Sequence, residues 1–400
     1  MKNKKEKIEI SEIFSSLQGE GKYAGTPMLF IRTYGCTKRC PWCDTRYAIE
    51  GSKYKEMTVN QLVKIIKNYE GLYICWTGGE PLLWRKGIEK IIEKIKGITN
   101  DYKKGYLLGV RYGDGYINYK KRGFTLQCKD FEMLLRFKKY IRDLFGKEYS
   151  TQVVTKDSNQ YTGISICANE IVNFLDTKPQ SKEQERGFVS GFFDSEGTIC
   201  CRGNSVDLSI AQKEPEILKY IIRITKRYGL DFTLYDFREK HNMCGLRLKI
   251  KRRGWYYDKK EVQDFYRIFQ PAIRRKFKKV KNLKEIKFHL ESNGDLLNEY
   301  DFLMYDYLAI SPKEQKVIGK INKLIEKYNF ITNWDIKVVT DLDKIGKDLI
   351  PYATMLMPLS TYNKKKDLQI QRKVWNYCIK YNFNFTPRYQ YWIWGKKRSV

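Results

Sequence analysis

One stretch decides how the first part of this chain folds: Gly35-Cys36-Thr37-Lys38-Arg39-Cys40-Pro41-Trp42-Cys43-Asp44-Thr45. Cysteine spacings of four and three residues can bring three thiolates onto one inorganic centre. A structural zinc site uses four N or S donors, and neither His241 nor His289 lies near the stretch. The spacing therefore favours a [4Fe–4S] cluster, with one iron open to another ligand, over a closed zinc site.

Length and composition indicate a globular chain with more than one core. The chain has 400 residues, of which 42% are hydrophobic, so we expect two or three domains. No run of apolar residues is long enough for a membrane span, and Met1–Lys7 lacks the apolar segment of a signal peptide. Ten cysteines with three in one short stretch fit a reducing compartment better than a disulfide framework. We expect a cytoplasmic protein.

The net charge of +30 favours a polyanionic partner. The range 247–287 holds 16 Lys and Arg against 4 Asp and Glu, a net charge of +12, and aromatic residues are interleaved with the charges. Such a segment can follow a phosphate backbone, or it can be a solvated face of a lysine-rich protein. The sequence leaves both interpretations open.

Strands and helices alternate on both sides of a central interruption. We predict strands at 7–14, 26–33, 72–76, within 286–294, and at 307–310, 335–339 and 353–357, with helices at 59–69, 87–96, 312–328 and 365–381. The cysteine stretch and the turn Thr77-Gly78-Gly79-Glu80-Pro81 each follow a strand. Ligands of parallel β/α folds bind at such strand ends, so we predict an α/β fold with its site there.

The interruption contains an internal repeat. Leu107–Gly115 matches Val189–Gly197 position by position, and the acids of the two copies, Asp114 and Glu196, are 82 residues apart. After each copy the order strand, strand, helix, strand, strand can be followed, which implies a duplication with a pseudo-twofold axis and an αββαββα repeat. We predict one discontinuous domain, 1–97 plus 286–400, and an inserted domain, 98–285.

The three cysteines, together with Gly78-Gly79-Glu80-Pro81, resemble the radical S-adenosylmethionine (SAM) superfamily. The resemblance implies a partial (β/α)6 radical SAM barrel whose cluster is held by Cys36, Cys40 and Cys43. It also implies that SAM binds the open iron through its amino and carboxylate groups, and that reduction of the cluster cleaves SAM to a 5′-deoxyadenosyl radical. The SAM contacts that it implies are Trp42, Cys43, Asp44, Gly78, Gly79, Glu80, Ser311, Pro312 and Lys313.

The flanks are similar to one family in particular, the 7-carboxy-7-deazaguanine synthases. The likeness rests on Leu17–Gly21, Phe30–Arg32, Cys40–Thr45, Glu291–Gly294, Ser311–Lys313 and Leu356–Leu359. It implies a lyase that converts 6-carboxy-5,6,7,8-tetrahydropterin to 7-carboxy-7-deazaguanine with loss of ammonia, on the route to the 7-deazaguanine bases of tRNA. The implied substrate residues are Leu17, Gln18, Gly19, Glu20, Arg32, Thr77 and Glu291.

The same likeness implies Mg²⁺ on the Thr45 hydroxyl, a flavodoxin-type or ferredoxin-type electron donor, and a homodimer formed through this domain. Arg32 is suited chemically to a substrate carboxylate. Taken singly, these residues also have ordinary structural interpretations: the Gln18–Gly21 segment as a turn, Thr45 as a helix cap and Glu291 as an ion-pair partner.

The interruption resembles a two-motif LAGLIDADG homing endonuclease. The resemblance implies that Asp114 and Glu196 are catalytic acids that share Mg²⁺, that the β-hairpins bind the DNA major groove, and that Gln127 and Gln212 assist. An intein is the rival interpretation of an in-frame insert. Splicing requires His-Asn before Cys, Ser or Thr, whereas His241-Asn242 precedes Met243, so we expect no splicing.

Two functions follow as hypotheses. In the first, the chain is a radical SAM lyase that carries an inserted domain. In the second, it is a site-specific DNA endonuclease whose host half is inactive. The insert follows a helix and precedes a strand, so we expect the chain to leave the barrel at its N-terminal face, opposite the active site.

Overall fold

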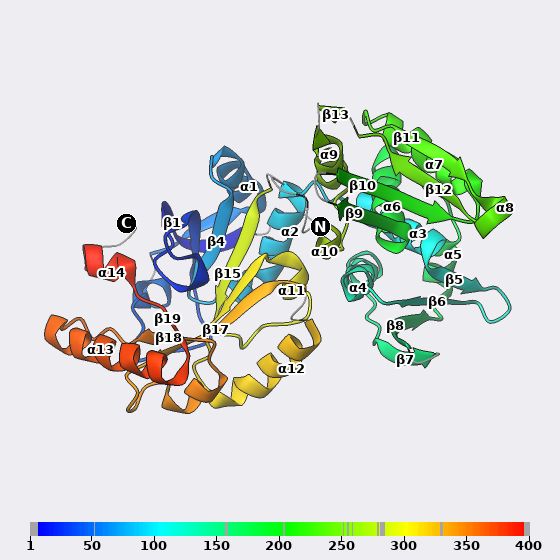
Figure 1. Cartoon of the computed structure of the whole chain (residues 1–400). Helices are drawn as coiled ribbons and strands as arrows, with labels where there is room; N and C mark the ends of the chain where they lie inside the picture. Colours follow the sequence, from blue (N-terminus) through cyan, green and yellow to red (C-terminus); the bar gives the residue numbers. More distant parts are fainter. Residues whose placement is uncertain are drawn as a thin grey trace. The chain divides into compact units, whose positions relative to one another are not determined.

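The computed structural model describes residues 7–51, 53–156, 159–202, 205–250, 252–253, 256–257, 259–277, 280, 285–328 and 331–395. These residues form two compact units (Figure 1). The first, unit 1, joins the part of the chain up to Ile95 with the part from Glu285 onward. The second, unit 2, begins at Lys96 and contains the described residues up to Val280. Among the described residues, no helix is long and apolar enough to cross a membrane.

Unit 1 is built on one mixed sheet. Among the described residues its strand order is β19-β18-β17-β16-β15-β4-β2-β1-β3. The strands are β1 (Lys7–Leu17), β2 (Pro27–Thr33), β3 (Lys55–Thr58), β4 (Tyr73–Gly78), β15 (Lys287–Ser292), β16 (Tyr307–Ile310), β17 (Asn333–Thr340), β18 (Met355–Pro358) and β19 (Asn384–Phe385). Every pair from β2 to β19 is parallel, whereas β1 pairs antiparallel with both β2 and β3. The carboxyl ends of the parallel strands therefore lie on the same side of the sheet.

Helices follow the parallel strands and lie outside the sheet (Figure 1). They are α1 (Val59–Asn68), α2 (Arg85–Ile95), α11 (Asp301–Met304), α12 (Ile318–Tyr328), α13 (Lys364–Tyr381) and α14 (Tyr389–Trp394), with short 3-10 turns η1 (Gly21–Tyr23), η2 (Arg46–Ala48), η3 (Pro81–Trp84), η4 (Gln315–Val317) and η5 (Lys347–Tyr352). Strands such as β16 and β18 are buried along their whole length because helices and loops cover both faces. The predicted β/α alternation of the flanks is confirmed.

Local chemistry explains where α1 begins and why α12 starts later than predicted. The Thr58 hydroxyl accepts a hydrogen bond from the Gln61 backbone, and the Gln61 side chain accepts one from the Thr58 backbone, which forms a capping box. The helix predicted from Pro312 begins at Ile318 instead, after the turn η4. The Ser311 backbone N–H donates to the Ser292 carbonyl at 2.7 Å, which ties the residues before the helix to β15.

The chain leaves unit 1 and re-enters it at the amino-terminal ends of the parallel strands. It leaves after α2 and returns at β15, whose first residue, Lys287, donates its backbone N–H to the Leu72 carbonyl beside the start of β4. The cysteine stretch begins at the other end of β2. The long interruption is therefore connected to unit 1 at the edge of the sheet opposite to the cysteine loop.

Unit 2 is centred on two helices that pack through glycines. These helices are α3 (Asn100–Gly113) and α6 (Lys182–Glu196). A Cβ on Gly109 would clash with the Phe188 carbonyl oxygen, and a Cβ on Gly191 would clash with the Tyr106 carbonyl oxygen. Likewise, a Cβ on Gly105 would clash with the Gln184 carbonyl oxygen, and a Cβ on Gly187 would clash with the Tyr102 carbonyl oxygen. The two backbones therefore touch, which larger residues would prevent.

Each central helix of unit 2 is followed by a four-stranded sheet. The first sheet has the order β5-β6-β8-β7, with β5 (Gly115–Asn118), β6 (Gly123–Cys128), β7 (Gln152–Lys156) and β8 (Asn159–Ile166). The second has the order β9-β10-β12-β11, with β9 (Gly197–Arg202), β10 (Ser205–Gln212), β11 (Phe232–Asp236) and β12 (Cys244–Leu248). The strands are thus arranged alike after both helices.

The remaining helices of unit 2 are α4 (Phe131–Phe145), α5 (Asn169–Leu175), α7 (Pro215–Lys226), α8 (Arg238–His241), α9 (Lys260–Phe269) and α10 (Arg274–Phe277), with a two-stranded pair of β13 (Arg252–Arg253) and β14 (Tyr256–Tyr257). Much of the basic range 247–287 lies here. Residues 251, 254–255, 258, 278–279 and 281–284 of that range lie outside the described residues, so its proposed path along DNA is not described.

Candidate functional site

A cavity in unit 1 lies where the parallel strands end. Its lining draws on the ends of β2, β4, β15, β16 and β17 and on the cysteine loop. The predicted site residues that line it are Leu17, Gln18, Gly19, Glu20, Arg32, Cys36, Cys40, Trp42, Cys43, Asp44, Thr45, Thr77, Gly78, Gly79, Glu291, Ser311 and Lys313. Two predicted residues, Glu80 and Pro312, are not among the lining residues. The fold thus brings nearly all of the unit 1 candidates to one place.

The three cysteines share the cavity, and all three are free thiols. Burial raises the pKa of the Cys36 and Cys40 thiols, and the Cys43 Sγ lies 3.6 Å from the Thr45 hydroxyl. Among the described residues, no three His, Cys, Asp or Glu side chains are assembled as a ready metal-ligand group. Three thiols around a cavity with no histidine in its lining are a donor set for iron rather than for a closed zinc site.

Glycines let the cysteine loop approach the end of β4. Gly79 donates its backbone N–H to the Thr33 carbonyl at 3.2 Å, and Glu80 donates to the Gly35 carbonyl at 2.7 Å. A Cβ on Gly79 would clash with that Gly35 carbonyl, and Gly78 has a φ of +119°, which favours glycine. The two glycines therefore fix the loop against the strand.

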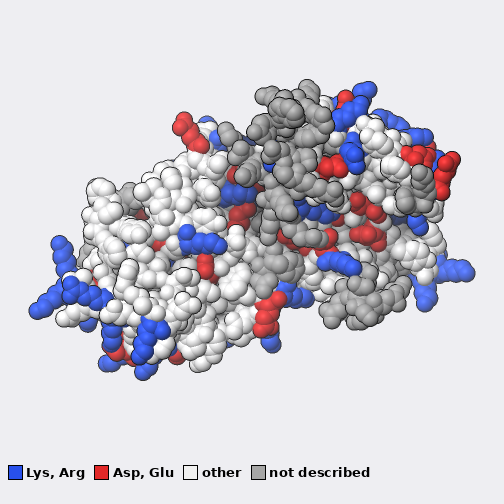
Figure 2. Space-filling view, in the orientation of Figure 1, with Lys and Arg blue, Asp and Glu red and all other residues white. Residues whose placement is uncertain are grey.

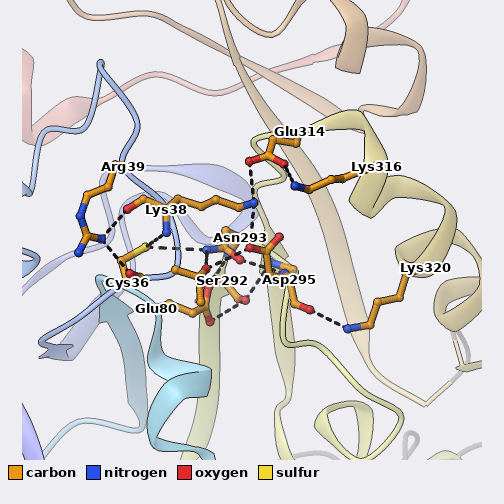
Figure 3. A network of polar contacts seen from close by, with 12 residues as sticks. Cys36, Lys38, Arg39, Glu80, Ser292, Asn293, Asp295, Glu314, Lys316 and Lys320 are labelled. Atoms are coloured by element: carbon orange, nitrogen blue, oxygen red, sulfur yellow. Dashed lines mark hydrogen bonds and ion pairs between the residues drawn. The ribbon is translucent and has the colours of Figure 1, made fainter.

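Glu80, predicted as a SAM contact, does not line the cavity, and its carboxylate is directed into the protein. The side chain is fully buried. Its oxygens accept hydrogen bonds from the Ser292 hydroxyl at 2.9 Å, the Asn293 backbone at 2.9 Å and the Leu82 backbone at 3.1 Å. Burial raises the pKa of Glu80 to about 7, although these hydrogen bonds oppose the rise. Its side chain joins strand ends (Figure 3).

Asn293 and its neighbours extend this network to the cysteine loop. The Asn293 amide donates to the Thr37 hydroxyl at 3.0 Å, and Lys38 pairs with Asp295 at 3.0 Å and Glu314 at 2.7 Å (Figure 3). Sequence reasoning placed Asn293 in a family motif but gave it no role. These contacts fix the loop from the side of β15.

A second polar cluster lies at the inner wall of the cavity. The Glu291 carboxylate accepts hydrogen bonds from the Gln18 amide at 3.1 Å and from the Thr77 hydroxyl at 2.6 Å. Three residues predicted for substrate binding, from three separate segments, are thus in direct contact. Their arrangement offers a carboxylate and an amide oxygen to N–H groups of a ligand.

Arg32 lines the cavity but is partly engaged. Its Nη1 lies 2.9 Å from the Glu12 carboxylate and also contacts the Tyr47 hydroxyl, while its Nε is buried and has no hydrogen-bond partner. The guanidinium lies over the Phe14 ring at 5.3 Å. An unpaired buried donor costs free energy unless a ligand supplies an acceptor, which fits a site for an anion.

Strand β17 and the C-terminal segment supply site residues that sequence reasoning missed. Lys337 pairs with Glu20 at 2.5 Å, and Arg388 joins Glu20 at 3.5 Å to Asp44 at 3.1 Å. Gln390 donates to Glu20 at 3.0 Å, and its Oε1 is buried without a partner. Burial would raise the pKa of Glu20, but Lys337 and Arg388 lower it to about 2. The only sequence signals were a lysine inside the predicted strand 335–339 and polar residues within an aromatic terminus.

The cavity has an excess of cationic side chains. Arg32, Lys38, Lys313, Lys337 and Arg388 line it, against the carboxylates of Glu20, Asp44 and Glu291. Lys313 donates to the Ser311 hydroxyl at 2.9 Å, and burial lowers its pKa. On the outer surface, Lys and Arg side chains project around the end of unit 1 that carries α13 (Figure 2). The cavity is suited to ligands with carboxylate groups.

Unit 2 brings its two predicted acids together. Asp114 and Glu196 end the helices α3 and α6. Burial and the neighbouring Asp114 raise the pKa of Glu196 to about 7, whereas Lys276 opposes the rise. Burial also raises the pKa of Asp114, which Lys276 lowers and Asp130 raises. The acids therefore interact with each other and with one lysine, whose Nζ is held by the Phe193 and Asp194 carbonyls.

The two glutamines of unit 2 differ in their placement. Gln212 donates to Glu196 at 3.3 Å. Gln127 is exposed on β6, and Asp130 follows it by three positions. Asp130, which is 82 residues before Gln212, acts electrostatically on Asp114. Leu126 pairs with Gly115 as Ile210 pairs with Gly197, so Cys128 is the counterpart of Gln212. Asp130, the residue before α4, is a neighbour of Asp114 that sequence reasoning missed.

Two family models match the chain. Residues 30–146 match the radical SAM superfamily, and residues 183–269 match a LAGLIDADG-like domain. The 7-carboxy-7-deazaguanine synthase of Aquifex aeolicus is 30% identical over 157 residues, which cover 38% of this chain and 70% of that protein. The enzyme of the same name from Thermoplasma acidophilum is 51% identical over 79 residues, and that from Hyperthermus butylicus is 42% identical over 91 residues.

The alignments with the last two relatives cover 20% and 23% of this chain, and 37% and 39% of those proteins. The chain therefore spans less than half of their length. Among solved structures, the homing endonuclease I-DmoI matches with 15% identity and a TM-score of 0.33, over 43% of this chain and 97% of that one. WhiA from Thermatoga maritima matches with 18% identity and a TM-score of 0.37, over 46% and 62%.

Proposed function

Because the chain belongs to the 7-carboxy-7-deazaguanine synthase family, we propose that unit 1 converts 6-carboxy-5,6,7,8-tetrahydropterin to 7-carboxy-7-deazaguanine with loss of ammonia. One observation carries the proposal: residues from segments far apart in the sequence meet in a single cavity that is lined by three thiols, polar side chains and an excess of cationic side chains. The domain limits that we propose are 1–97 plus 286–400 for the synthase and 98–285 for the inserted domain.

The donor set fits a [4Fe–4S] cluster with SAM. Cys36, Cys40 and Cys43 would hold the cluster, and Gly79, Ser311 and Lys313 line the cavity where SAM would bind. When bound, the cluster and SAM supply a 5′-deoxyadenosyl radical. Buried, unpaired donors on two residues that line the cavity, Arg32 and Trp42, support a site completed by a polar ligand.

The protein's part in the reaction is to orient the substrate and exclude water. The Arg32 guanidinium faces the cavity and is suited to the substrate carboxylate. Gln18, Thr77 and Glu291 form one hydrogen-bonded group, whose remaining acceptors suit the N–H edge of a pterin ring. Glu20, held ionised between Lys337 and Arg388, fixes the loop that carries Gln18.

The remaining assignments are also proposals. Thr45 would bind Mg²⁺ through its hydroxyl, which lies beside the Cys43 thiol. A low-potential flavodoxin-type or ferredoxin-type protein would deliver the electron, and unit 1 would form the homodimer. Each assignment concerns residues or surfaces of unit 1 alone.

The test is an anaerobic incubation of the whole chain, reconstituted with iron and sulfide, with SAM, reductant, Mg²⁺ and 6-carboxy-5,6,7,8-tetrahydropterin. Mass spectrometry should detect 7-carboxy-7-deazaguanine, and ammonia should appear in equal amount. The matched control, Cys36→Ala, should give neither product. Folded, iron-loaded protein that cleaves SAM but leaves the pterin unchanged would refute the proposal.

We propose a second activity for unit 2, site-specific cleavage of double-stranded DNA with Mg²⁺. Its support is the meeting of Asp114 and Glu196 at the ends of two helices whose glycine contacts are reciprocal. Each glycine contact recurs with both partners exchanged between the helices and shifted by 82 positions, so that Gly109 meets Phe188 as Gly191 meets Tyr106, which is what a pseudo-twofold axis would give. The test is cleavage of a duplex that carries the uninterrupted host coding sequence, because the insertion would destroy the target. Intact DNA after incubation with Mg²⁺ and folded protein would refute it.

A further inference from the structure

Asn293 is a buried residue at the end of β15 whose side chain reaches the cysteine loop. Its Nδ2 donates to the Thr37 hydroxyl at 3.0 Å and lies 3.9 Å from the Cys36 sulfur, within reach of an N–H···S hydrogen bond (Figure 3). Its Oδ1 accepts the Asp295 backbone N–H at 2.9 Å. Because that oxygen faces an N–H donor, the orientation of the amide is fixed and its NH₂ group faces the sulfur.

Glu80 holds Asn293 in this position. The Glu80 carboxylate accepts the Asn293 backbone N–H at 2.9 Å and the Ser292 hydroxyl at 2.9 Å. The Glu80 backbone in turn donates to Gly35, the residue before Cys36, at 2.7 Å. One buried acid thus fixes both the donor and the loop that carries the acceptor.

Cys36 receives a second N–H donor from its own loop. The Lys38 backbone N–H lies 3.4 Å from the Cys36 sulfur. The Lys38 ammonium is directed elsewhere, because it pairs with Asp295 and Glu314. The side-chain N–H group directed at this sulfur is therefore that of the neutral Asn293 amide, while the Glu80 carboxylate acts on Cys36 only electrostatically.

Hydrogen bonds to ligand sulfurs are one of the means by which a protein sets the reduction potential of an iron–sulfur cluster. A reduced cluster carries one more electron than the oxidised form, and part of that charge lies on its sulfurs. An N–H donor consequently stabilises the reduced form more than the oxidised form. A donor at Cys36 makes the cluster easier to reduce.

We propose that Asn293 raises the reduction potential of the cluster through its hydrogen bond to Cys36, and that Glu80 is the residue that positions Asn293. The inference rests on the proposed function only for the presence of a cluster on the three cysteines. It assigns to the polar end of β15 a role in electron acceptance, which is separate from substrate binding.

The test is an anaerobic redox titration of the whole, cluster-loaded chain, with the reduced cluster followed by electron paramagnetic resonance, in the absence of pterin. For Asn293→Leu, the ratio of reduced to oxidised cluster at a fixed solution potential should fall about tenfold, which corresponds to a midpoint about 59 mV more negative for a one-electron couple. Asn293→Asp, which replaces the donor by a carboxylate, should shift the midpoint at least as far. Glu80→Gln removes a carboxylate charge that acts on Cys36, and this loss alone would make the midpoint more positive. A midpoint more negative than that of the wild-type chain is therefore expected only if Glu80 positions Asn293, and a more positive midpoint would refute that positioning role.

Lys320→Met is the matched control, because Lys320 contacts the Asp295 carbonyl in the same network but not the sulfur. Its midpoint should equal that of the wild-type chain. A wild-type midpoint in loaded Asn293→Leu would overturn the proposal. Loss of iron from both Asn293 variants would also overturn it, because the residue would then serve cluster assembly. The titration needs no product, so a shifted midpoint without deazaguanine formation would sink the proposed function alone.

Discussion

Glu80 in unit 1 and Glu196 in unit 2 have the same raised pKa, about 7, but very different surroundings. Glu80 accepts three hydrogen bonds from the protein. Glu196 accepts one from the described part of the chain, donated by Gln212, and interacts with a second acid, Asp114. A perturbed pKa therefore does not by itself identify a functional group. The hydrogen-bond partners separate a carboxylate that holds strands together from one that has few partners and that we propose binds a cation.

The largest effect that we expect is on DNA cleavage, from a change at Glu196, the acid with few hydrogen-bond partners. Glu196→Gln removes one of two charges from the proposed Mg²⁺ site, so DNA cleavage should fall to background. The same change should not lower the thermal stability of unit 2, because it relieves repulsion from Asp114. Gel assays of cleavage and a melting curve check the two parts. A cleaving variant, or a strongly destabilised one, would remove the contrast with Glu80.

Glu80→Ala, unlike Glu196→Gln, should lower the stability of the unit that contains it. It leaves the Ser292 hydroxyl and the backbone N–H groups of Leu82 and Asn293 buried without acceptors, so unit 1 should lose about 4 kcal/mol of unfolding free energy. Denaturant unfolding measures the loss. Glu314→Gln, which alters a half-exposed ion pair beside the same loop, should change stability far less than Glu80→Ala does. Equal effects of the two changes would contradict the structural role of Glu80.

The glycine contacts of unit 2 can be tested with one methyl group. Gly109→Ala forces a Cβ into the Phe188 carbonyl, so unit 2 should lose about 3 kcal/mol. In Gly319→Ala on α12, the added Cβ meets nothing within 4 Å, so this change should stabilise unit 1 by about 0.5–1 kcal/mol. Differential scanning calorimetry reports both. A neutral Gly109→Ala would show that the helices are not in backbone contact.

A smaller effect that we expect is a pH dependence of stability from a third buried titratable group, His289. His289 is buried against Tyr23, Tyr73 and Tyr307, and burial lowers its pKa to about 4 from 6.5. The unfolded chain binds the proton more readily, so this residue's contribution is complete above pH 6.5 and decreases as the pH falls toward 4. The loss should be about 2 kcal/mol between pH 7 and pH 5.

The check is unfolding of the wild-type chain and of His289→Phe at several pH values. The difference in unfolding free energy between the two chains should decrease as the pH falls from 6.5 toward 4. This comparison separates the effect of His289 from those of Glu80 and Glu20, which both chains contain. A difference that does not depend on pH would mean that the imidazole titrates normally.

Much of this organisation could be predicted from the sequence, because strand and helix periodicities and short motifs are local. The cysteine loop, the Gly78-Gly79 turn and the paired acids of the repeat all lie where the pattern places them. Residues that depend on long-range packing could not be predicted. Arg388 becomes a site residue only because the C-terminal segment returns to Glu20 and Asp44.

Sequence patterns also could not reveal the direction in which side chains point. Glu80 lies in a motif that indicates a SAM contact, yet its carboxylate turns into the protein toward Ser292. Lys337 is a lysine within a buried strand, which is stable only because Glu20 offers a buried partner. The contact of Asn293 with the Cys36 sulfur could not be predicted either, because Cys36 lies more than 250 positions earlier in the chain.

The most direct test of the central claim, that unit 1 holds a complete synthase site in the interrupted chain, is one rate. It is the rate of 7-carboxy-7-deazaguanine formation by the whole, cluster-loaded chain that carries Glu196→Gln. We predict the same rate as for the chain without the substitution, because Glu196 belongs to unit 2. No product from either chain, with cluster and SAM cleavage intact, would contradict the account.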